Sequence, residues 1–152
     1  MSIIRLATEA DIPFIDADLY PHLHNNHVPS EGRICYVISS QDYYLVVADE
    51  GTINQPFLLG TCTMHVIMQA ASAPHGMMND LVVHPDRTRE GVGRLLFEYL
   101  EDVARKRSCK TIFFTCSPKR ITGNKFHIFM GYKMIAAAVD ENGTNLYEKE
   151  LC

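Results

Sequence analysis

The chain has 152 residues, of which 47% are hydrophobic and 21% are charged, and its formal net charge is −4. This is the composition of an ordinary globular protein, and the length suits one domain with a sizeable core. No apolar run reaches the roughly 18–20 residues that span a bilayer, and the first residues lack the pattern of a signal peptide. The five cysteines contain no Cys-x-x-Cys pair and are expected to be reduced and mostly buried, with Cys152 the exposed exception. We therefore expect one domain over residues 1–152, a cytoplasmic location and no membrane partner.

The charges are unevenly distributed along the chain. Residues 1–83 hold two cations, Arg5 and Arg33, against nine carboxylates, whereas residues 84–125 hold ten cations against five carboxylates. A basic segment suits a phosphate-bearing ligand, and an acidic remainder suits a cationic one. The alternative is an accident of surface composition.

Clusters of β-branched and aromatic residues predict strands, and capped apolar periodicity predicts helices. Thr8 is a good N-cap, with Glu9 and Asp11 in the first turn, for a helix that runs to about Leu19. Residues 20–32 are expected to form a loop or a broken helix. In chain order, the sequence predicts a strand over 3–6, a helix over 8–19, a segment 33–39 whose composition leaves a helix open, strands over 43–48, 57–68 and 77–84, a helix from about 91, a strand over 111–116, a helix over 119–130, and strands over 132–139 and 144–150.

The helix that begins near Gly91 has the clearest periodicity in the sequence. Its apolar residues recur at helical spacing from Val92 to Val103, and Glu101 with Arg105 is expected to form an i, i+4 pair on the outer face. The strand over 111–116 is almost continuously apolar, as expected when both of its faces are covered. This order of elements predicts an α+β fold in which helices flank a mixed sheet.

A glycine turn joins the strand that ends at His84 to this helix. Its sequence is Thr88-Arg89-Glu90-Gly91-Val92-Gly93. Glycine at 91 and 93 lets backbone approach a ligand, and the first turn of a helix presents unpaired N–H groups to an anion. The turn and the basic residues around it, Arg87 and Arg94 included, therefore predict a diphosphate site.

Two common nucleotide motifs do not fit this turn. The dinucleotide fingerprint needs a third glycine where the chain has Leu96, and the nucleoside-triphosphate loop needs a Gly-Lys-Ser/Thr run that is missing. Gly-x-Gly alone is also compatible with a plain flexible turn.

The residues around the turn resemble the acetyl-CoA motif of the GNAT acyltransferases. The similar residues are Asp80-Leu81-Val82-Val83-His84-Pro85-Asp86, the glycine turn and Arg94-Leu95-Leu96. Further along, Phe126-His127-Ile128-Phe129-Met130-Gly131-Tyr132 is similar to the family's Phe-Tyr-x-x-x-Gly-Phe/Tyr segment. The resemblance is strongest over 77–134, and the order of elements extends it to nearly the whole chain.

The resemblance implies a GNAT fold, with a mixed, mostly antiparallel central sheet, a splayed strand pair and helices on both faces. It implies acetyl-CoA as co-substrate, no metal, and a chain that can form a homodimer. Backbone groups of Leu81 and Val83 would hold the pantetheine and polarise the thioester carbonyl. The implied cofactor-binding residues are Leu81, Val82, Val83, Thr88, Arg89, Glu90, Gly91, Val92, Gly93, Arg94, Asn124 and Phe126.

The sequence departs from the family at three places. Thr88 stands where Arg or Gln is usual, His127 stands where a tyrosine commonly assists the departing thiolate, and Met77 and Asn79 stand where the family often has a base on the strand. His127 is expected either to donate that proton or simply to fill the tyrosine position. The base is open between Asp80, which only a β-bulge would turn toward the acceptor, and a water oriented by Asn79. With Leu81 as the backbone donor, the implied catalytic residues are therefore His127, Asn79, Asp80 and Leu81, while His65, His75 and the early loop remain other sources of a base.

Three histidines lie close together at positions 22, 24 and 27. A zinc site would need a further ligand, and the nearest candidate is Glu31, so a polar loop is the simpler interpretation and no metal is expected. The resemblance implies that this loop lines the acceptor pocket. The implied acceptor-binding residues are Tyr20, His24 and His27.

The leading hypothesis is direct transfer of an acyl group, acetyl in the first instance, from acyl-CoA to an amine of a small molecule or peptide. The alternative is a non-catalytic acyl-CoA-binding module. Nucleic-acid binding is disfavoured, because the basic residues 105–125 lack interleaved aromatic residues apart from Phe113 and Phe114, which belong to a core strand.

Overall fold

The structure is a computed structural model that describes residues 2–23, 27–52 and 54–151. It divides into two compact units. The first consists of Met1–His65 and Asp80–Leu100, and the second of Val66–Asn79 and Glu101–Cys152. The strands β3 and β4 and the helix α3 each pass from one unit into the other.

The first unit is built on an antiparallel sheet. Its hydrogen-bonded order is β1-β2-β3-β4, and β1 pairs with β2 from Ile3↔Asp49 to Leu6↔Val46. Arg5 of β1 donates to Asp11 and Asp49, so one guanidinium joins the strand to its neighbour and to the first helical turn. The strands are β1 (Ile3–Leu6), β2 (Tyr43–Asp49), β3 (Leu58–Ile67) and β4 (His75–Val83).

The predicted helix over 8–19 is helical, but it is not one regular α-helix. A 3-10 turn over Glu9–Asp11 leads into α1 (Ile12–Phe14), a π-helical turn over Ile15–Leu19 and a 3-10 turn over Tyr20–His22. The Asp11 carboxylate accepts from the Thr8 N–H at 2.8 Å, which confirms the predicted start. Proline near the start of α1 and of the last turn removes backbone donors, which contributes to the changes of pitch.

The segment predicted as a loop or a broken helix over 20–32 is helical at both of its ends. Besides the turn at its start, α2 (Glu31–Ser39) begins two residues before the predicted boundary at 33. Ser30 is the N-cap, and its hydroxyl accepts from the Arg33 N–H at 3.2 Å. The open question about 33–39 is thus resolved in favour of a helix.

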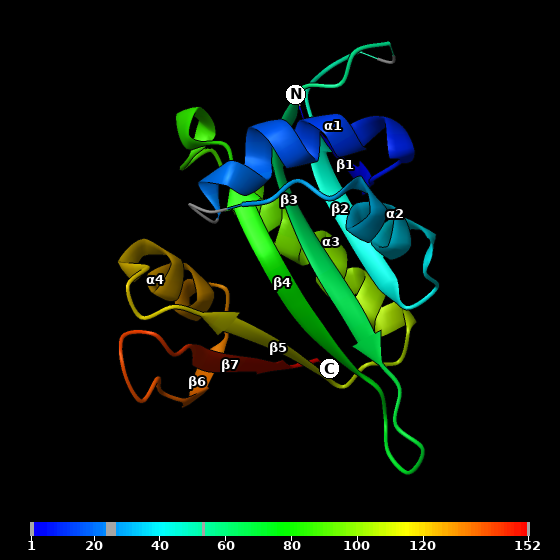
Figure 1. Cartoon of the computed structure of the whole chain (residues 1–152). Helices are drawn as coiled ribbons and strands as arrows, with labels where there is room; N and C mark the ends of the chain where they lie inside the picture. The colour runs from blue at the N-terminus through cyan, green and yellow to red at the C-terminus, as the bar shows by residue number, and fades with distance from the viewer. Residues whose placement is uncertain (1, 24–26, 53, 152) are drawn as a thin grey trace. The chain divides into compact units, whose positions relative to one another are not determined.

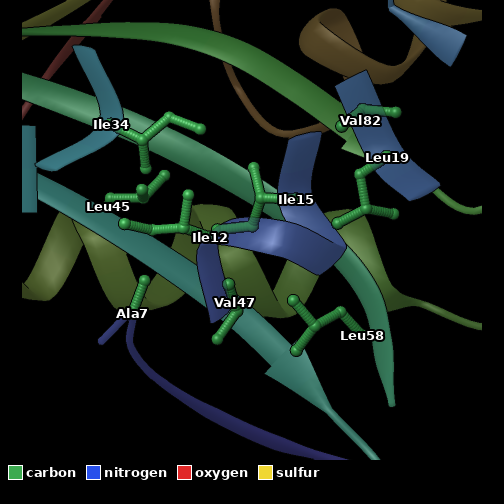
Figure 2. Packing of buried hydrophobic residues seen from close by; sticks show 9 residues of the cluster. All are labelled: Ala7, Ile12, Ile15, Leu19, Ile34, Leu45, Val47, Leu58 and Val82. Atoms are coloured by element: carbon green, nitrogen blue, oxygen red, sulfur yellow. The ribbon is translucent and has the colours of Figure 1, made fainter. Parts of the chain in front are cut away.

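The core of the first unit lies between the sheet and the N-terminal helices. Figure 2 shows aliphatic side chains from α1, α2 and the strands pointing toward one another. In Figure 1, α1 and α2 cover one face of the sheet, and α3 (Val92–Lys106) covers the other. The residues of this cluster are Ala7, Ile12, Ile15, Leu19, Ile34, Leu45, Val47, Leu58 and Val82.

The second unit adds parallel and antiparallel pairing. The order of its strands is β4-β5-β7-β6. Here β4 pairs with β5 in parallel from His75↔Thr111 to Met78↔Phe114, whereas β7 is antiparallel to β5 and β6. The sheet is therefore mixed, as predicted. The elements new to this unit are β5 (Thr111–Cys116), α4 (Ile121–Phe129), β6 (Lys133–Ala136) and β7 (Asn145–Glu150).

The strand predicted over 132–139 ends at Ala136. Beyond it, the Ala138 N–H donates to the side-chain oxygen of Asn145 at 2.8 Å instead of to the backbone of β7. The predicted turn at 140–143 is present, since the Gly143 N–H donates to the Asp140 carbonyl. Just before the turn, the Asn145 side chain thus takes the place of a backbone acceptor of β7.

The expected i, i+4 pair of Glu101 and Arg105 is present at 3.9 Å, but Glu101 does not lie on the outer face of α3. Glu101 is only 4% exposed, and its carboxylate accepts from the Lys149 ammonium at 3.0 Å and from the Tyr132 hydroxyl at 3.1 Å. Arg105 stays 3.9 Å away and is closer to Asp102. Lys149 and Tyr132, which are distant in sequence, offset the cost of burying the Glu101 carboxylate. Helical spacing alone does not reveal such partners.

Candidate functional site

The glycine turn leaves β4 through a short 3-10 turn over Pro85–Arg87 and enters α3 at Val92. Arg89 and Gly91 both have left-handed backbone, with φ of 65° and 82°. The Gly91 carbonyl accepts from the Leu95 N–H at 3.1 Å, which starts the helical ladder. The N–H groups of the first turn of α3 therefore lack acceptors within the helix, the arrangement that binds anions.

Two of the three arginines at this turn form salt bridges. Arg87 pairs with Glu50 at 2.6 Å and with Glu90 at 2.7 Å, and Arg94 pairs with Glu98 at 2.7 Å. Arg89 is exposed and forms no ion pair with any residue that the structure describes. Its charge and the backbone N–H groups thus provide most of the attraction for an anion, and Arg87 and Arg94 provide less than composition suggests.

Gly60 of β3 is a positioning residue that the sequence analysis missed. A Cβ at this position would lie 2.8 Å from the Val82 carbonyl oxygen, 3.1 Å from Val92 and 3.3 Å from Leu96. The first turn of α3 therefore packs directly against the backbone of the sheet. A lone glycine within a strand is the available signal for such a close approach.

The backbone of β4 is irregular at Asp80. Asp80 has φ of 56°, and it is exposed although Met78 and Val82 on either side of it are buried. Regular alternation would place all three side chains on one face. The ladder to β5 also stops at Met78↔Phe114, although β4 continues to Val83. The left-handed backbone at Asp80 and its exposure show that the regular alternation of β4 breaks here.

The negative charge of Asp80 influences two neighbouring groups in the first unit. Burial, then the carboxylate of Asp80, raise the pKa of Tyr20 above its ordinary value of 10.0. Burial and the same carboxylate raise the pKa of the fully buried Cys62 thiol. The Thr63 hydroxyl hydrogen-bonds Tyr20 and opposes this effect there. Asp80, Tyr20 and the middle of β3 therefore share one electrostatic environment.

The histidines after α1 have protein partners. His27 Nε2 lies 2.9 Å from a carboxylate oxygen of Asp16, and the Ser30 N–H donates to the other oxygen at 3.0 Å. The rings of His22 and His84 meet edge to face at 5.7 Å, and those of Tyr20 and His27 at 5.4 Å. His24 lies outside the described residues. No cluster of three metal-ligating side chains occurs among the residues whose positions are given.

In the second unit, His127 of α4 is 2% exposed and surrounded by aromatic rings. The ring centroids lie 4.3 Å from Phe114, 5.4 Å from Tyr147 and 5.6 Å from Phe126. Burial lowers the pKa of His127 from 6.5 to about 4. The imidazole is therefore neutral near pH 7, and donation from a histidinium is disfavoured.

Asn124 anchors α4 to β7. Its amide nitrogen donates to the carbonyls of Ser117 at 2.9 Å and Arg120 at 2.7 Å. Its oxygen accepts from the Tyr147 hydroxyl at 2.6 Å and the Asn145 amide at 3.1 Å. Both polar atoms of this predicted cofactor contact are thus used inside the unit. Phe126, the other predicted contact, is half-buried.

The second unit also contains an open cavity of about 710 Å³ that the sequence analysis did not predict. Met77, Phe113 and Leu146 provide apolar lining, and Lys110 is the cation. The ring of His75 meets that of Phe113 edge to face at 5.2 Å.

Comparisons with known proteins place this geometry in context. Residues 9–132 match the sequence model described as the acetyltransferase (GNAT) family. No curated protein matches the chain significantly. None of the described helices combines the length and apolar character needed to cross a membrane.

Three solved structures illustrate the fold similarity. yncA of Salmonella typhimurium, solved with its cofactor acetyl-CoA, has a TM-score of 0.80 and 19% identity over 100% of this chain and 95% of that one. Ribosomal-protein-alanine N-acetyltransferase of Brucella melitensis has a TM-score of 0.76 and 19% identity over 98% and 99%. A transcriptional regulator of Bacillus halodurans C-125 has a TM-score of 0.81 and 16% identity over 92% and 98%. At these identities the likeness concerns the fold.

Proposed function

Because the chain belongs to the acetyltransferase (GNAT) family, we propose that it transfers an acyl group, acetyl in the first instance, from acyl-CoA to an amine by direct attack. Residues 1–152 would then form a single acetyltransferase domain. The observation that carries the proposal is the turn between β4 and α3. Left-handed backbone at Arg89 and Gly91, the N-terminus of α3 and the exposed charge of Arg89 together suit a pyrophosphate.

The donor is assigned to the residues of this turn and of the end of β4. Backbone N–H groups of Arg89, Gly91, Gly93 and Arg94 would hold the pyrophosphate, and backbone groups of Leu81 and Val83 would hold the pantetheine. Val82, Thr88, Glu90 and Val92 would contact the donor as parts of the same backbone. Because these contacts come mainly from the backbone, Thr88 in place of a longer side chain would reduce the affinity for the donor only slightly.

The acceptor side is assigned to Asp80 and its surroundings. The amine nitrogen attacks the thioester carbon, so the C–N bond forms, and collapse of the tetrahedral intermediate breaks the C–S bond. We assign Asp80 as the acceptor of the amine proton, directly or through a water oriented by Asn79, because Asp80 is exposed where the regular backbone of β4 is interrupted. Tyr20 and His27 would line the path of the acceptor.

The leaving thiolate needs little assistance in this scheme. A thiol of this kind has a pKa of about 8.5, so its thiolate is a competent leaving group near neutral pH. The pKa of about 4 at His127 favours a packing role for this side chain, with at most a neutral hydrogen bond. Because His127 is then no acid for the leaving group, a non-catalytic acyl-CoA-binding module is the second candidate function.

Turnover of acetyl-CoA with a mixed amine library, followed by release of free thiol, tests the proposal. We expect thiol release with at least one amine class, and a loss of kcat of about 100-fold in Asp80→Asn. Asp86→Asn is the matched control, because this exposed carboxylate lies just beyond the end of β4. Thermal stabilisation by CoA without thiol release from any amine would select the binding module. Full activity of Asp80→Asn with an unchanged pH profile would remove Asp80 from the mechanism.

A further inference from the structure

The open cavity of the second unit takes no part in the proposed chemistry. All of its lining residues belong to Val66–Asn79 or Glu101–Cys152, so this unit forms the cavity by itself. Its volume of about 710 Å³ lies within the range of roughly 300–1,000 Å³ that small-molecule sites occupy. The cavity is therefore large enough for a small organic molecule.

One end of the cavity is apolar. Met77 of β4 and Phe113 of β5 are partners in the parallel ladder, so their side chains lie next to each other on one face of the sheet. Leu146 of β7 is the partner of Thr115, two residues further along β5, and continues the same face. These apolar side chains are only half-buried, and they line the cavity. An apolar ligand group would remove their surface from water.

The other end of the cavity is polar. His75 and Thr111 are partners in the same ladder, two residues before Met77 and Phe113, and Lys110 precedes Thr111. None of these three side chains forms a hydrogen bond or an ion pair with a residue that the structure describes. An ammonium, a hydroxyl and an imidazole therefore converge on this end with their hydrogen-bonding capacity unused.

The backbone of Lys110 is held at the rim of the cavity. Its N–H donates to the Pro74 carbonyl at 3.4 Å, and its carbonyl accepts from the Leu151 N–H at 2.7 Å. These bonds tie it to the connection between β3 and β4 on one side and to the residue after β7 on the other. The position from which the ammonium reaches the cavity is thus fixed before a ligand binds, which lowers the entropic cost of binding.

The charges around the cavity favour an anion with one negative charge. The lining contains Lys110 and no carboxylate. Two acidic residues of β7 share this face of the sheet outside the lining: Glu148 lies opposite Phe113, and Glu150 lies opposite Thr111. Glu148 also has Lys133 opposite it on β6, so Glu150 is the carboxylate that opposes an anion here. One cation suits a carboxylate, whereas a phosphate with nearly two charges needs more.

We propose that this cavity binds a small carboxylic acid with an aromatic or branched aliphatic body. The carboxylate lies beside Lys110, where the ammonium and the Thr111 hydroxyl donate to it. The body of the ligand covers Phe113 and Leu146. An apolar surface with a few convergent polar groups is the usual composition of a small-molecule site. This site goes beyond acyl transfer, because neither the glycine turn nor Asp80 contributes to it.

An NMR titration with 3-phenylpropanoate, in the presence of excess CoA, tests the proposal. We expect a dissociation constant on the order of 1 mM, as is typical for a ligand of about eleven non-hydrogen atoms. The shifted amide signals should centre on His75, Lys110, Thr111 and Phe113. The neutral amide 3-phenylpropanamide should bind about tenfold more weakly, and acetate and inorganic phosphate should not compete at equal concentration.

Substitutions at the two ends of the cavity separate charge from apolar contact. We expect Lys110→Met to raise the dissociation constant about five- to tenfold, and Leu146→Gln to raise it about threefold. Glu150→Gln should lower it about twofold, because a like charge is removed. Lys106→Met is the matched control, since Lys106 is an exposed cation at the end of α3 outside the lining, and it should have no effect. Circular dichroism and melting temperatures establish that each variant is folded.

Four results would overturn the proposal. They are the absence of saturable shifts up to about 20 mM probe, equal binding of the acid and its amide, equal effects of Lys110→Met and Lys106→Met, and displacement of the probe by excess CoA, which would assign it to the donor site. None of these measurements requires turnover. Failure of the proposed acyl transfer would therefore leave the test of this cavity intact.

Discussion

Arg87, just before the glycine turn, pairs with Glu90 inside it: its Nε lies 2.7 Å from the Glu90 carboxylate, while its Nη1 lies 2.6 Å from that of Glu50. Glu50 directly follows β2, so one guanidinium connects the turn to the end of this strand in the first unit. The pairs raise the pKa of Arg87 and lower that of Glu50, which keeps both groups charged. We infer that Arg87 positions the turn and does not itself neutralise a phosphate.

Replacement of Arg87 tests this positioning role. We expect Arg87→Ala to raise KM for acetyl-CoA about five- to tenfold and to change kcat less than twofold, because exposed pairs make modest contributions. Arg87→Lys should recover only part of the loss, since an ammonium cannot hold two carboxylates with a planar fork. Arg94→Ala is the control, because Arg94 pairs with Glu98 within α3 and leaves the turn unaffected. Equal effects of the two alanine variants on KM would contradict the inference.

Local patterns in the sequence predicted the elements and the turn well. The apolar spacing of α3, the turn residues at 140–143 and the glycine turn each depend on neighbours within a few positions. An irregularity at Asp80 was anticipated only as a condition, since residue type does not reveal a positive φ. The partners of Glu101 and His127 could not be predicted, because Lys149, Tyr132 and Phe114 reach them through tertiary packing.

The same reason explains why composition overestimated the positive charge at the turn. A count of arginines treats Arg87, Arg89 and Arg94 alike. In the structure, two of them are paired with carboxylates, one of which, Glu50, lies far from the turn in sequence. Charge patterning locates a ligand site but does not tell which charges face the ligand.

Gly91 should be sensitive to substitution because of its left-handed backbone conformation and not because a side chain would clash with its neighbours. Its φ is 82°, and a Cβ there would meet no heavy atom within 4 Å. Gly91→Ala is expected to lower the free energy of unfolding by roughly 1–2 kcal/mol, the cost of left-handed backbone in an L-residue. Donor binding should also weaken, because relief of this strain would move the anion-binding N–H groups.

Gly32 provides the matched control. It also has open space around its Cβ position, but its φ is not in the left-handed region, and it lies in the first turn of α2. Gly32→Ala should leave stability unchanged or raise it by a few tenths to about 1 kcal/mol. Chemical denaturation of the two variants measures both effects, and equal destabilisation would show that backbone conformation is not the cause.

Lys149 should stabilise the second unit through Glu101. Its ammonium lies 3.0 Å from the buried carboxylate and also donates to the Met130 carbonyl at 3.0 Å. Lys149→Met leaves Glu101 with the Tyr132 hydroxyl and the more distant Arg105, so we expect a loss of about 1–3 kcal/mol. In the double variant with Glu101→Gln the loss should be smaller than the sum of the single losses. Strict additivity in a double-mutant cycle would show that the two groups do not interact.

His127 should make the protein less stable in mild acid. Burial lowers its pKa in the folded protein to about 4, whereas an unfolded chain binds the proton near pH 6.5. The unfolded state therefore takes up more protons as pH falls through 6.5, and folding loses stability down to about pH 4, where the loss levels off. The shift corresponds to at most about 3 kcal/mol.

The corresponding measurement is the free energy of unfolding against pH for the wild type and for His127→Phe, a variant that keeps an aromatic ring among Phe114, Phe126 and Tyr147. Even if the substitution changes stability at pH 7, the slope between pH 6.5 and 4 should become shallower by about one proton at its steepest point. An unchanged slope would mean that His127 is protonated as easily in the folded chain as in the unfolded one. In that case His127 would again be a candidate for the acid that the family resemblance implies, and full thiol release by both His127→Phe and His127→Ala would be needed to exclude it.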